Sequence, residues 1–427
     1  MRLSIPYGDG ALEFELPDGV PTQVIGPGCG LGEEVAPPAS PTAADEEAEI
    51  RRALAQPIGS PRLSELAASA RSAAIVVSDV TRPCPSYRFL PALLAELSSI
   101  PPERITILFA LGGHRGHTPE EQAQLVGPEV VASGVRLLDL DAAGCVPVGT
   151  TSRGTRLEVF EPYLDADLRI CTGNIEYHYF AGFSGGAKAV VPGLCSYAAI
   201  RDNHSMMLAP TARAGIIDGN PVREDIDEAG AMIGIDFLFN VLLGEDKRII
   251  EAVAGHFLEA HRVGVEAYDR RCDLRIPEAA DVVIASPGGT PKDINLYQAQ
   301  KTLDNVGGAV RKGGAVILVA RCREGFGQRE FEEWMLGMTT PQALVDRIQR
   351  EFVLGGHKAA AIAGLLADVD VYLVSELPDE AVRKMCMHPF PDVDRAVAAA
   401  LARYGERARF LVVPNGSRVV AHDAGRS

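Results

Sequence analysis

The sequence predicts an α/β protein with two domains, each built on a mainly parallel sheet. Short apolar runs rich in β-branched residues end in polar turns, at residues 73–77, 105–110 and 281–286 among others. Uninterrupted apolar runs of this kind are typical of parallel strands buried on both faces. Helical segments lie between the runs, and 427 residues correspond to two or three domains of ~150 residues each.

We expect a single domain boundary, between residues 272 and 273. We place an N-terminal α/β domain at residues 1–272 and a C-terminal α/β domain at residues 273–427, with a hinge at residues 272–278. Further strands are expected at residues 135–141, 167–171, 237–243 and 248–254 of the first domain. The active site is expected in the cleft between the two domains.

Composition limits the possible partners and locations. The net charge of −16 disfavours nucleic-acid binding, which needs clustered Lys and Arg. No apolar run approaches the ~18 residues of a membrane span, and the N-terminus lacks an apolar signal core. The eight cysteines form no Cys-x-x-Cys pair and are expected to be buried hydrophobes. We therefore expect a cytoplasmic protein.

Reactive side chains follow three of the predicted strands. Asp79, Thr81 and Arg82 come after the run at 73–77, and His114 comes after the run at 105–110. In open α/β sheets, ligands bind at the edge formed by the carboxyl ends of the strands. Each residue alone has an ordinary explanation, such as a helix cap or a surface ion pair. Their repetition at successive strand ends favours a functional site.

The third strand, at 167–171, leads into a glycine-rich stretch at residues 173–193 that contains His178, Phe180, Ser184 and Lys188. Glycines allow positive φ angles and a close approach of backbone N–H groups to a ligand, as in phosphate-binding loops. A Gly-rich stretch is most often an ordinary turn. Two potentially reactive side chains within it, and His204 shortly after, indicate a site that binds an anionic cofactor near Lys188.

A second candidate segment follows the predicted strand at 281–286. Asn295 can cap a helix that carries Tyr297, Gln298 and Lys301 on neighbouring positions of one side. A lysine on a helix is usually only exposed to solvent, and that alternative stays open for Lys301. The segment at residues 355–358, Gly-Gly-His-Lys, receives no role.

These motifs together resemble the nickel-pincer lactate racemase family, in order and with compatible spacing from about residue 70 to residue 375. The departures are Tyr177, where many relatives have Pro, and Ala187, where many have Arg. The residues that carry the resemblance are Asp79-x-Thr-Arg-Pro83, Gly113-His-Arg115, His178-x-x-Ala-Gly-Phe-Ser-Gly-Gly-x-Lys188, Asn203-His204 and Asn295-Leu-Tyr-Gln-Ala-x-Lys301.

The resemblance implies a nickel pincer nucleotide, pyridinium-3-thioamide-5-thiocarboxylic acid mononucleotide with bound nickel, as the cofactor. It assigns Lys188 as the covalent attachment point and His204 as the protein ligand of nickel, for which imidazole is a suitable donor. It also assigns His114 and His178 as the acid/base pair. Substrate-binding roles are implied for Arg82, Lys301, Tyr297 and Gln298, and cofactor-binding roles for Asp79, Thr81, Phe180 and Ser184.

The implied reaction inverts C2 of a 2-hydroxy acid by reversible hydride transfer to the cofactor, with the two histidines moving the hydroxyl proton. Histidine suits this task because its unperturbed pKa of ~6.5 lies near neutral pH. Lactate or a related acid is the expected substrate, and malate or gluconate is an alternative. Enzymes that synthesise the cofactor are expected partners, and the oligomeric state is left open.

Two hypotheses of other kinds remain. Lys188 or Lys301 can be a Schiff-base lysine in a keto-acid lyase, which requires a lysine with a lowered pKa. The protein can also be a non-catalytic carrier of the cofactor, although a carrier needs only Lys188 and His204. The paired histidines favour the enzyme.

Overall fold

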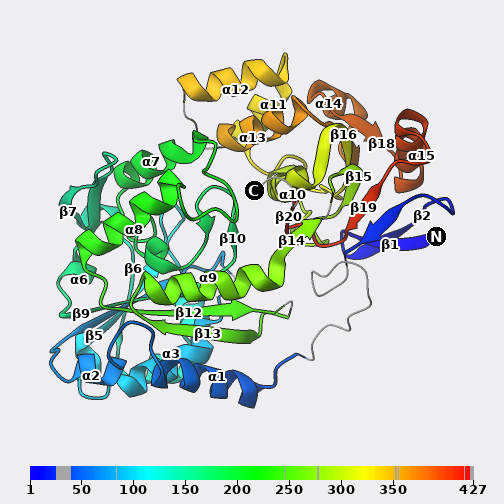
Figure 1. The fold of residues 1–427 in the computed structure, drawn as a ribbon. Helices are drawn as coiled ribbons and strands as arrows, with labels where there is room; N and C mark the ends of the chain where they lie inside the picture. Colours follow the sequence, from blue (N-terminus) through cyan, green and yellow to red (C-terminus); the bar gives the residue numbers. More distant parts are fainter. Residues whose placement is uncertain are drawn as a thin grey trace. The chain divides into compact units, whose positions relative to one another are not determined.

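The computed structural model describes residues 1–25, 40–82, 84–244, 246–276, 278–351, 353, 355–417 and 419–423. The chain forms two compact units (Figure 1). One unit, here called the core unit, spans Ala39–Arg270, and the other, here called the split unit, combines Met1–Pro38 with Arg271–Ser427. Each unit contains a six-stranded sheet with helices packed against it. The predicted fold class, two α/β domains with mainly parallel sheets, is confirmed.

The sheet of the core unit has the strand order β13-β12-β9-β4-β5-β6. All neighbouring strands are parallel except β12 and β13, which are antiparallel. The strand bounds are β4 (Ala73–Ser78), β5 (Ile105–Ala110), β6 (Arg136–Asp139), β9 (Leu168–Asn174), β12 (Phe237–Leu243) and β13 (Ile249–Gly255).

The central strands of this sheet are apolar because both of their faces are covered. In β4, five of the six residues are buried, and Ile75 is the register partner of Ile107 in β5 and of Ile170 in β9. Burying a Val or Ile side chain contributes roughly 1.5–3 kcal/mol. The apolar runs in the sequence therefore become the middle of the sheet, as parallel strands require.

Helices of the core unit follow the strands and cover the sheet. Local sequence sets some of their ends, for example at α4, where Thr118 and Glu121 form a capping box and Pro119 occupies the first turn. The helices are α1 (Ala43–Ala55), α2 (Leu63–Ala67), α3 (Ser86–Glu96), α4 (Pro119–Val126), α5 (Pro128–Ala132), α6 (Glu161–Leu164), α7 (Tyr197–Ser205), α8 (Pro221–Ile233) and α9 (Glu259–Cys272).

Two small antiparallel pairs complete the core unit. The strands β7 (Cys145–Thr150) and β8 (Arg156–Phe160) form a hairpin, and β10 (Tyr177–His178) pairs with β11 (Gly182–Phe183). The second pair lies within the glycine-rich stretch, which continues into the 3₁₀ turn η3 (Gly186–Ala189). That stretch is thus an ordered part of the core unit and not only a turn.

The split unit has an all-parallel sheet with the order β18-β17-β16-β15-β19-β3. Its strands are β3 (Thr22–Val24), β15 (Ala280–Ala285), β16 (Val310–Val319), β17 (Asp370–Val374), β18 (His388–Phe390) and β19 (Phe410–Val413). Its helices are α10 (Leu296–Val306), α11 (Arg329–Leu336), α12 (Pro341–Arg350), α13 (Gly356–Leu366), α14 (Asp379–Lys384) and α15 (Val393–Tyr404). The hairpin β1 (Arg2–Tyr7) and β2 (Gly10–Glu15) and the parallel pair β14 (Asp273–Ile276) and β20 (Val420–Asp423) also belong to it.

The N-terminal residues belong to a different unit from the one expected. Residues 1–272 were assigned to one domain, but residues 1–38 belong with the C-terminal residues. The cause is strand pairing, since β3 extends the split-unit sheet beside β19. Ile5 and Phe14 add to this by packing in one buried cluster with Val282 of β15. The chain passes from the core unit to the split unit between Arg270 and Arg271, directly before the expected hinge at residues 272–278, and β14 within that segment pairs with β20.

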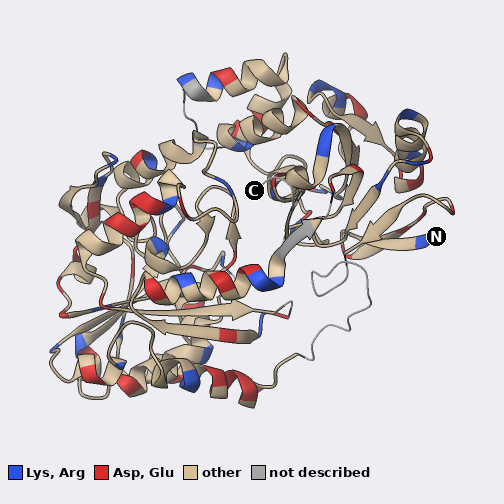
Figure 2. Ribbon diagram, in the orientation of Figure 1, with Lys and Arg blue, Asp and Glu red and all other residues tan. Residues whose placement is uncertain are grey.

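Charged residues are concentrated on the helices, and both signs occur together on α1 and α9 (Figure 2). On α1 the two signs form pairs one turn apart, such as Arg51 with Glu47. Such exposed pairs contribute little to stability, typically 0.3–0.5 kcal/mol each. Within the part of the chain that the structure describes, no helix combines the length and the apolar character that a membrane span requires.

The assignment of the N-terminus to the split unit can be tested with Phe14→Ala. Phe14 is 1% exposed, and a buried Phe→Ala substitution typically costs 3–5 kcal/mol. Hydrogen exchange should accelerate in β15 and β19 and stay unchanged in β4 and β9, as measured by mass spectrometry of peptides. The reciprocal control is Leu93→Ala, because Leu93 is fully buried in the core unit. Faster exchange of β4 and β9 in Phe14→Ala would contradict the assignment.

Candidate active site

Three neighbouring strand ends build the site in the core unit. The parallel strand β4 has β5 on one side and β9 on the other. The chain leaves β4 towards β5 and β6, and later adds β9, β12 and β13 on the opposite side. This reversal is a topological switch point, where open α/β sheets bind ligands. The prediction that the loops after these three strands share one edge is confirmed.

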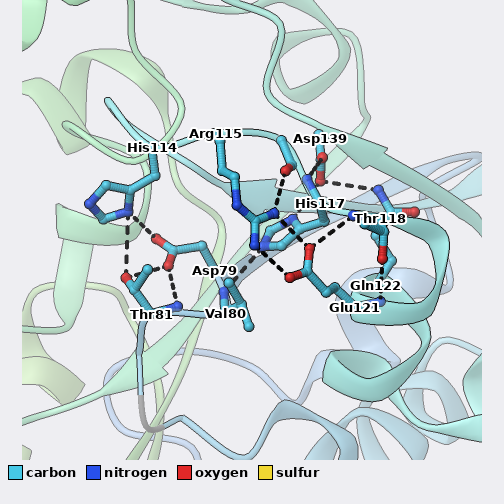
Figure 3. Close-up of polar contacts among 11 residues, drawn as sticks. Asp79, Val80, Thr81, His114, Arg115, His117, Thr118, Glu121, Gln122 and Asp139 are labelled. Atoms are coloured by element: carbon cyan, nitrogen blue, oxygen red, sulfur yellow. Dashed lines mark hydrogen bonds and ion pairs between the residues drawn. The ribbon is translucent and has the colours of Figure 1, made fainter. Parts of the chain in front are cut away.

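Asp79, Thr81 and His114 are brought together at this edge (Figure 3). Asp79 Oδ1 accepts hydrogen bonds from the backbone N–H of Thr81, at 2.6 Å, and from its hydroxyl. Asp79 Oδ2 lies 3.0 Å from His114 Nδ1. The Asp79 side chain is 4% exposed, whereas that of His114 is 43% exposed. The buried Asp79 carboxylate thus orients the His114 ring through Nδ1, and the ring itself is partly exposed to solvent.

The hydrogen bonds to Asp79 decide its charge. Burial acts to raise the pKa of the Asp79 carboxyl, but hydrogen bonds from His114 and Thr81 and the charge of Arg82 outweigh it and hold that pKa at about 2. An ionised carboxylate only accepts hydrogen bonds. His114 therefore carries a proton on Nδ1, and in the neutral ring its Nε2 is the atom that can accept a proton.

A second histidine in the same loop, His117, has a structural role. Its side chain is completely buried, with Nδ1 2.8 Å from Asp139 Oδ1. Its Nε2 accepts the backbone N–H of Val80 at 3.1 Å (Figure 3). Both ring nitrogens are engaged, so His117 joins the loop after β4 to the end of β6. The sequence motif Gly113-His-Arg115 selected His114, and the burial and hydrogen bonds of His117 give the physical reason for that choice.

Buried side chains from distant elements hold the glycine-rich stretch. On α8, the guanidinium of the fully buried Arg223 donates to the carbonyls of Ala181, at 3.1 Å, and Phe183. On β12, Asn240 Oδ1 accepts the N–H of Gly186 at 2.8 Å. On α9, His261 Nε2 donates to the carbonyl of Ser184 at 2.9 Å. Buried backbone groups must be paired, and these contacts fix the path of the stretch.

These holding residues were missed from the sequence. One signal was present, since Asn240 is a polar residue in the middle of the apolar strand Phe-Leu-Phe-Asn-Val-Leu-Leu, and a buried polar group needs a partner. The close packing also explains two glycines. A Cβ atom on Gly185 would lie 2.5 Å from Asn240 Oδ1, and one on Gly186 would lie 3.0 Å from the His261 ring. Both glycines have positive φ.

Lys188 lies in η3, within this supported stretch. Burial, together with the positive charges of Arg82 and Arg223, lowers the pKa of its amine to about 7. The charge of Arg82 acts on Lys188 from the loop after β4. The loop after β5 contacts the glycine-rich stretch directly, since Gly112 N–H donates to Gly193 O at 3.0 Å. Near neutral pH, a large fraction of Lys188 is therefore an uncharged, nucleophilic amine.

His178, Phe180 and His204 form a row of rings in edge-to-face contact. The Phe180 ring lies 4.6 Å from that of His178 and 4.8 Å from that of His204, between centroids. The His178 Nδ1 accepts the N–H of Ala181 at 3.2 Å, so a neutral His178 ring carries its proton on Nε2. His114 and His178 thus present opposite groups at Nε2, an acceptor on His114 and a donor on His178.

The remaining predicted residues of the core unit have defined places. The Ser184 hydroxyl donates to the carbonyl of Asn174 at 2.8 Å and accepts the N–H of Glu176 at 2.9 Å, so it supports the loop. Arg82 is exposed. Of the two departures from the family pattern, Tyr177 is buried and donates to Asp269 Oδ1 at 2.7 Å. Ala187 is completely buried.

Tyr297, Gln298 and Lys301 lie on α10 of the split unit, where the Asn295 side chain caps the helix by accepting the N–H of Gln298. Tyr297 is half-buried, Gln298 is exposed and Lys301 is partly exposed. The ammonium of Lys358 lies 3.7 Å from the centre of the Tyr297 ring and donates to Tyr297 O at 2.7 Å. The segment at 355–358, which received no role, thus supports Tyr297. That the active site lies in the cleft between the two domains stays a prediction.

Among the described residues, no group of three or more His, Cys, Asp or Glu side chains is arranged to hold a metal ion. The residues that fit the implied cofactor are of another kind. Lys188 offers an amine that is partly uncharged near neutral pH, and His204 offers an imidazole, which suits divalent nickel.

Comparison with known proteins agrees with the sequence motifs. A model of the lactate racemase N-terminal domain matches residues 7–215, and one of the lactate racemase C-terminal domain matches residues 276–421. A lactate racemase of Thermoanaerobacterium thermosaccharolyticum is 32% identical over 432 residues, which cover 99% of either chain. The chain belongs to the lactate racemase family. This membership makes it an isomerase of the racemase class.

Two further relatives extend the comparison. A lactate racemase of Lactiplantibacillus plantarum is 34% identical over 385 residues, which cover 88% of this chain and 91% of that protein. The solved structure of the T. thermosaccharolyticum lactate racemase apoprotein superposes with a TM-score of 0.86 at 31% identity, covering 99% of this chain and 100% of the other. A Thermotoga maritima protein shares the fold, with a TM-score of 0.61 at 18% identity and coverage of 88% and 97%.

The lowered pKa of Lys188 can be measured by acylation of the protein without cofactor. The rate of modification of the Lys188 peptide should rise with pH and reach half its maximum near pH 7, whereas Nα-acetyl-lysine follows the ordinary value of ~10.4. In the unfolded chain, the Lys188 amine stays protonated up to about pH 10. Its contribution to the free energy of unfolding should therefore rise between pH 7 and pH 10. Lys188→Gln is the control. A half-maximum near pH 10 would contradict the assignment.

Proposed function

We propose that this member of the family inverts C2 of a 2-hydroxy acid, lactate or a related acid, with a nickel pincer nucleotide as cofactor. The two relatives named lactate racemase and their coverage of the chain support the substrate class. The observation that carries the proposal is the position of Lys188 in the loop beside the switch point that also carries His178, where the pKa of its amine is lowered to about 7. Attachment of the cofactor through a thioamide would acylate the lysine amine, and this requires an uncharged, nucleophilic amine at that place.

The cofactor would be held by residues of the core unit. Lys188 would form the covalent attachment, and His204 would ligate nickel. Phe180 would pack against the cofactor and His204, whose ring it already contacts. Thr81 and the backbone held by Ser184 would line the site. When bound, the group supplies an acceptor for the hydride of C2.

The acid/base roles follow from the hydrogen bonds of the two histidines. His114, oriented by Asp79, would take the substrate hydroxyl proton at Nε2 as the C2–H bond breaks, leaving a planar 2-keto acid. His178, with its proton on Nε2, would donate that proton to the carbonyl oxygen from the other side of the planar keto acid. In the reverse direction the two rings exchange roles. Asp79 was expected to bind the cofactor, and its contacts favour a role in positioning His114.

The substrate carboxylate needs positive charge, which the chain as a whole lacks at a net charge of −16. Arg82, exposed at the end of β4, would supply it from the core unit and Lys301 from the split unit. Tyr297 and Gln298 would line the substrate site. A larger acid such as malate or gluconate is the alternative substrate. Two further predictions remain: that enzymes which make the cofactor are partners of this protein, and that the protein is cytoplasmic.

The proposal is tested with protein produced together with the cofactor-synthesising enzymes. The Lys188 peptide should carry a nucleotide-sized adduct by mass spectrometry, and the loaded protein should interconvert the enantiomers of lactate or of another acid in a panel that includes malate and gluconate. Lys188→Ala should show neither adduct nor activity. Activity in protein with an unmodified Lys188 would refute the covalent cofactor, and an adduct without activity on any acid would favour the non-catalytic carrier.

A second candidate rests on the same amine. A lysine with a pKa of about 7 is also what a Schiff-base lyase of keto acids requires. Borohydride added with a 2-keto acid should leave Lys188 unmodified if the racemase proposal holds. A reduced substrate adduct on Lys188 in protein without cofactor would favour the lyase.

The histidine pair gives a sharper test of the mechanism. Because every turnover uses both rings, His114→Ala and His178→Ala should each slow racemisation in both directions by ~10²–10⁴, the usual value of a general acid or base. In a single turnover with loaded protein, each variant should still form keto acid from one enantiomer, and the two variants should prefer opposite enantiomers. His388→Ala, an exposed residue of the split unit, is the control. Near wild-type racemisation in either variant would refute the pair.

A further inference from the structure

A buried hydrogen-bonded chain leads to His204 from the interior of the core unit. It consists of Asp225 on α8 and Asn203 on α7, which are both completely buried, and His204 next to Asn203. The Asp225 carboxylate accepts hydrogen bonds from the hydroxyls of Thr151, at 2.5 Å, and Thr155, at 2.8 Å. These threonines flank the turn of the β7–β8 hairpin. Among these residues, only Asn203 and His204 belong to a motif recognised in the sequence.

The orientation of the Asn203 amide is forced by its surroundings. One end lies 2.8 Å from Asp225 Oδ2 and 3.3 Å from the carbonyl oxygen of Val222. Both of these oxygens are acceptors, so this end must be the NH₂ group. The other end is therefore the carbonyl oxygen, which can only accept a hydrogen bond. A flipped amide would place its single oxygen against these two acceptor oxygens in a buried site, which is costly.

The Asn203 oxygen then decides the state of the His204 ring. It lies 3.2 Å from His204 Nδ1, and a hydrogen bond between them requires a proton on Nδ1. In a neutral imidazole the lone pair is then on Nε2. We propose that Asp225, acting through Asn203, holds His204 in the Nδ1–H tautomer and thereby presents Nε2 for coordination. The part that concerns coordination rests on the proposed function, whereas the tautomer does not.

Metal-binding histidines commonly donate their second ring N–H to an oxygen that fixes the ring, and loss of such a partner typically costs 10–100-fold in metal affinity. Here the oxygen belongs to a neutral amide, and the negative charge lies one residue further inside, on Asp225. Asn203 and Asp225 are thus positioning residues for His204. The residues of this hydrogen-bonded chain come from three elements: α7, α8 and the β7–β8 hairpin. The position of His204 therefore depends on the packing of all three.

The tautomer can be read directly by NMR on protein without cofactor, labelled with ¹⁵N at histidine and held at pH 8.5. Two- and three-bond ¹H–¹⁵N correlations should show His204 with the proton on Nδ1, and its signals are identified by their loss in His204→Gln. Two other histidines are internal references. His117 should show the proton on Nδ1, and His178 should show it on Nε2.

Substitutions then test the cause. Asn203→Leu removes the oxygen and should convert His204 to a mixture of both tautomers, as should Asp225→Asn, which releases the orientation of the Asn203 amide. Thr155→Val is the matched control, because it removes a hydrogen bond from Asp225 but leaves the Asn203 contacts in place. The His117 signals should stay unchanged in every variant that folds. A wild-type His204 with its proton on Nε2, or an unchanged tautomer in Asn203→Leu, would overturn the proposal.

Nickel retention separates this proposal from the proposed function. In cofactor-loaded protein, Asn203→Leu should weaken nickel binding 10–100-fold, measured by competition with a chelator, and His204→Ala should lose nickel. Cys195→Ser, a buried thiol, should retain it. If His204→Ala keeps its nickel while the tautomer is as described, the proposed metal ligand is wrong and the hydrogen-bonded chain still stands. If nickel retention in Asn203→Leu equals that of the wild type, the coordination part of the proposal fails.

Discussion

The constraint on which the site depends is the need to pair buried backbone groups in the glycine-rich stretch. Its carbonyls at Ala181 and Phe183 lie away from water and accept hydrogen bonds from Arg223, whose guanidinium is itself fully buried. A buried cation is costly unless it is hydrogen-bonded, so the arginine and the loop stabilise each other. In the same stretch, partial desolvation of Lys188 and the positive charges of Arg82 and Arg223 disfavour its ammonium form.

Histidine illustrates how the environment, and not the residue type, sets the chemistry. His114 has its Nδ1 on an ionised carboxylate and its Nε2 side partly in solvent. His117, three residues later, is closed off by Val80 and Asp139. His178 accepts a backbone N–H at the nitrogen where His114 donates. Because hydrogen bonds are directional, His114 and His117 carry the proton on Nδ1 and His178 carries it on Nε2. The Nε2 of His117 is already bonded inside the protein, so only His114 and His178 suit proton transfer.

Much of the fold follows from local sequence. The runs that became β4, β5 and β15 are continuous and apolar, and the strand pair β12–β13 was visible from its β-branched and aromatic residues. What the sequence did not reveal were strands defined by distant partners. The strand β3 has three residues and joins β19 almost 390 residues later, and β14 pairs with β20 at the other end of the chain. Such short segments contain too few residues to show an alternating pattern of apolar and polar side chains. Their pairing is a property of the assembled sheet.

The sequence by itself determined which chemistry is available: a lysine behind two glycines, histidines after parallel strands, and an Asn-His pair, in an order that identifies the family. The tertiary structure decided how each group is held. It separated His114 from His117 by burial, lowered the pKa of Lys188 by desolvation, and oriented Asn203 through Asp225. These properties depend on distances and dielectric surroundings between residues far apart in the chain, and such information exists only once α7, α8 and the sheet are packed together.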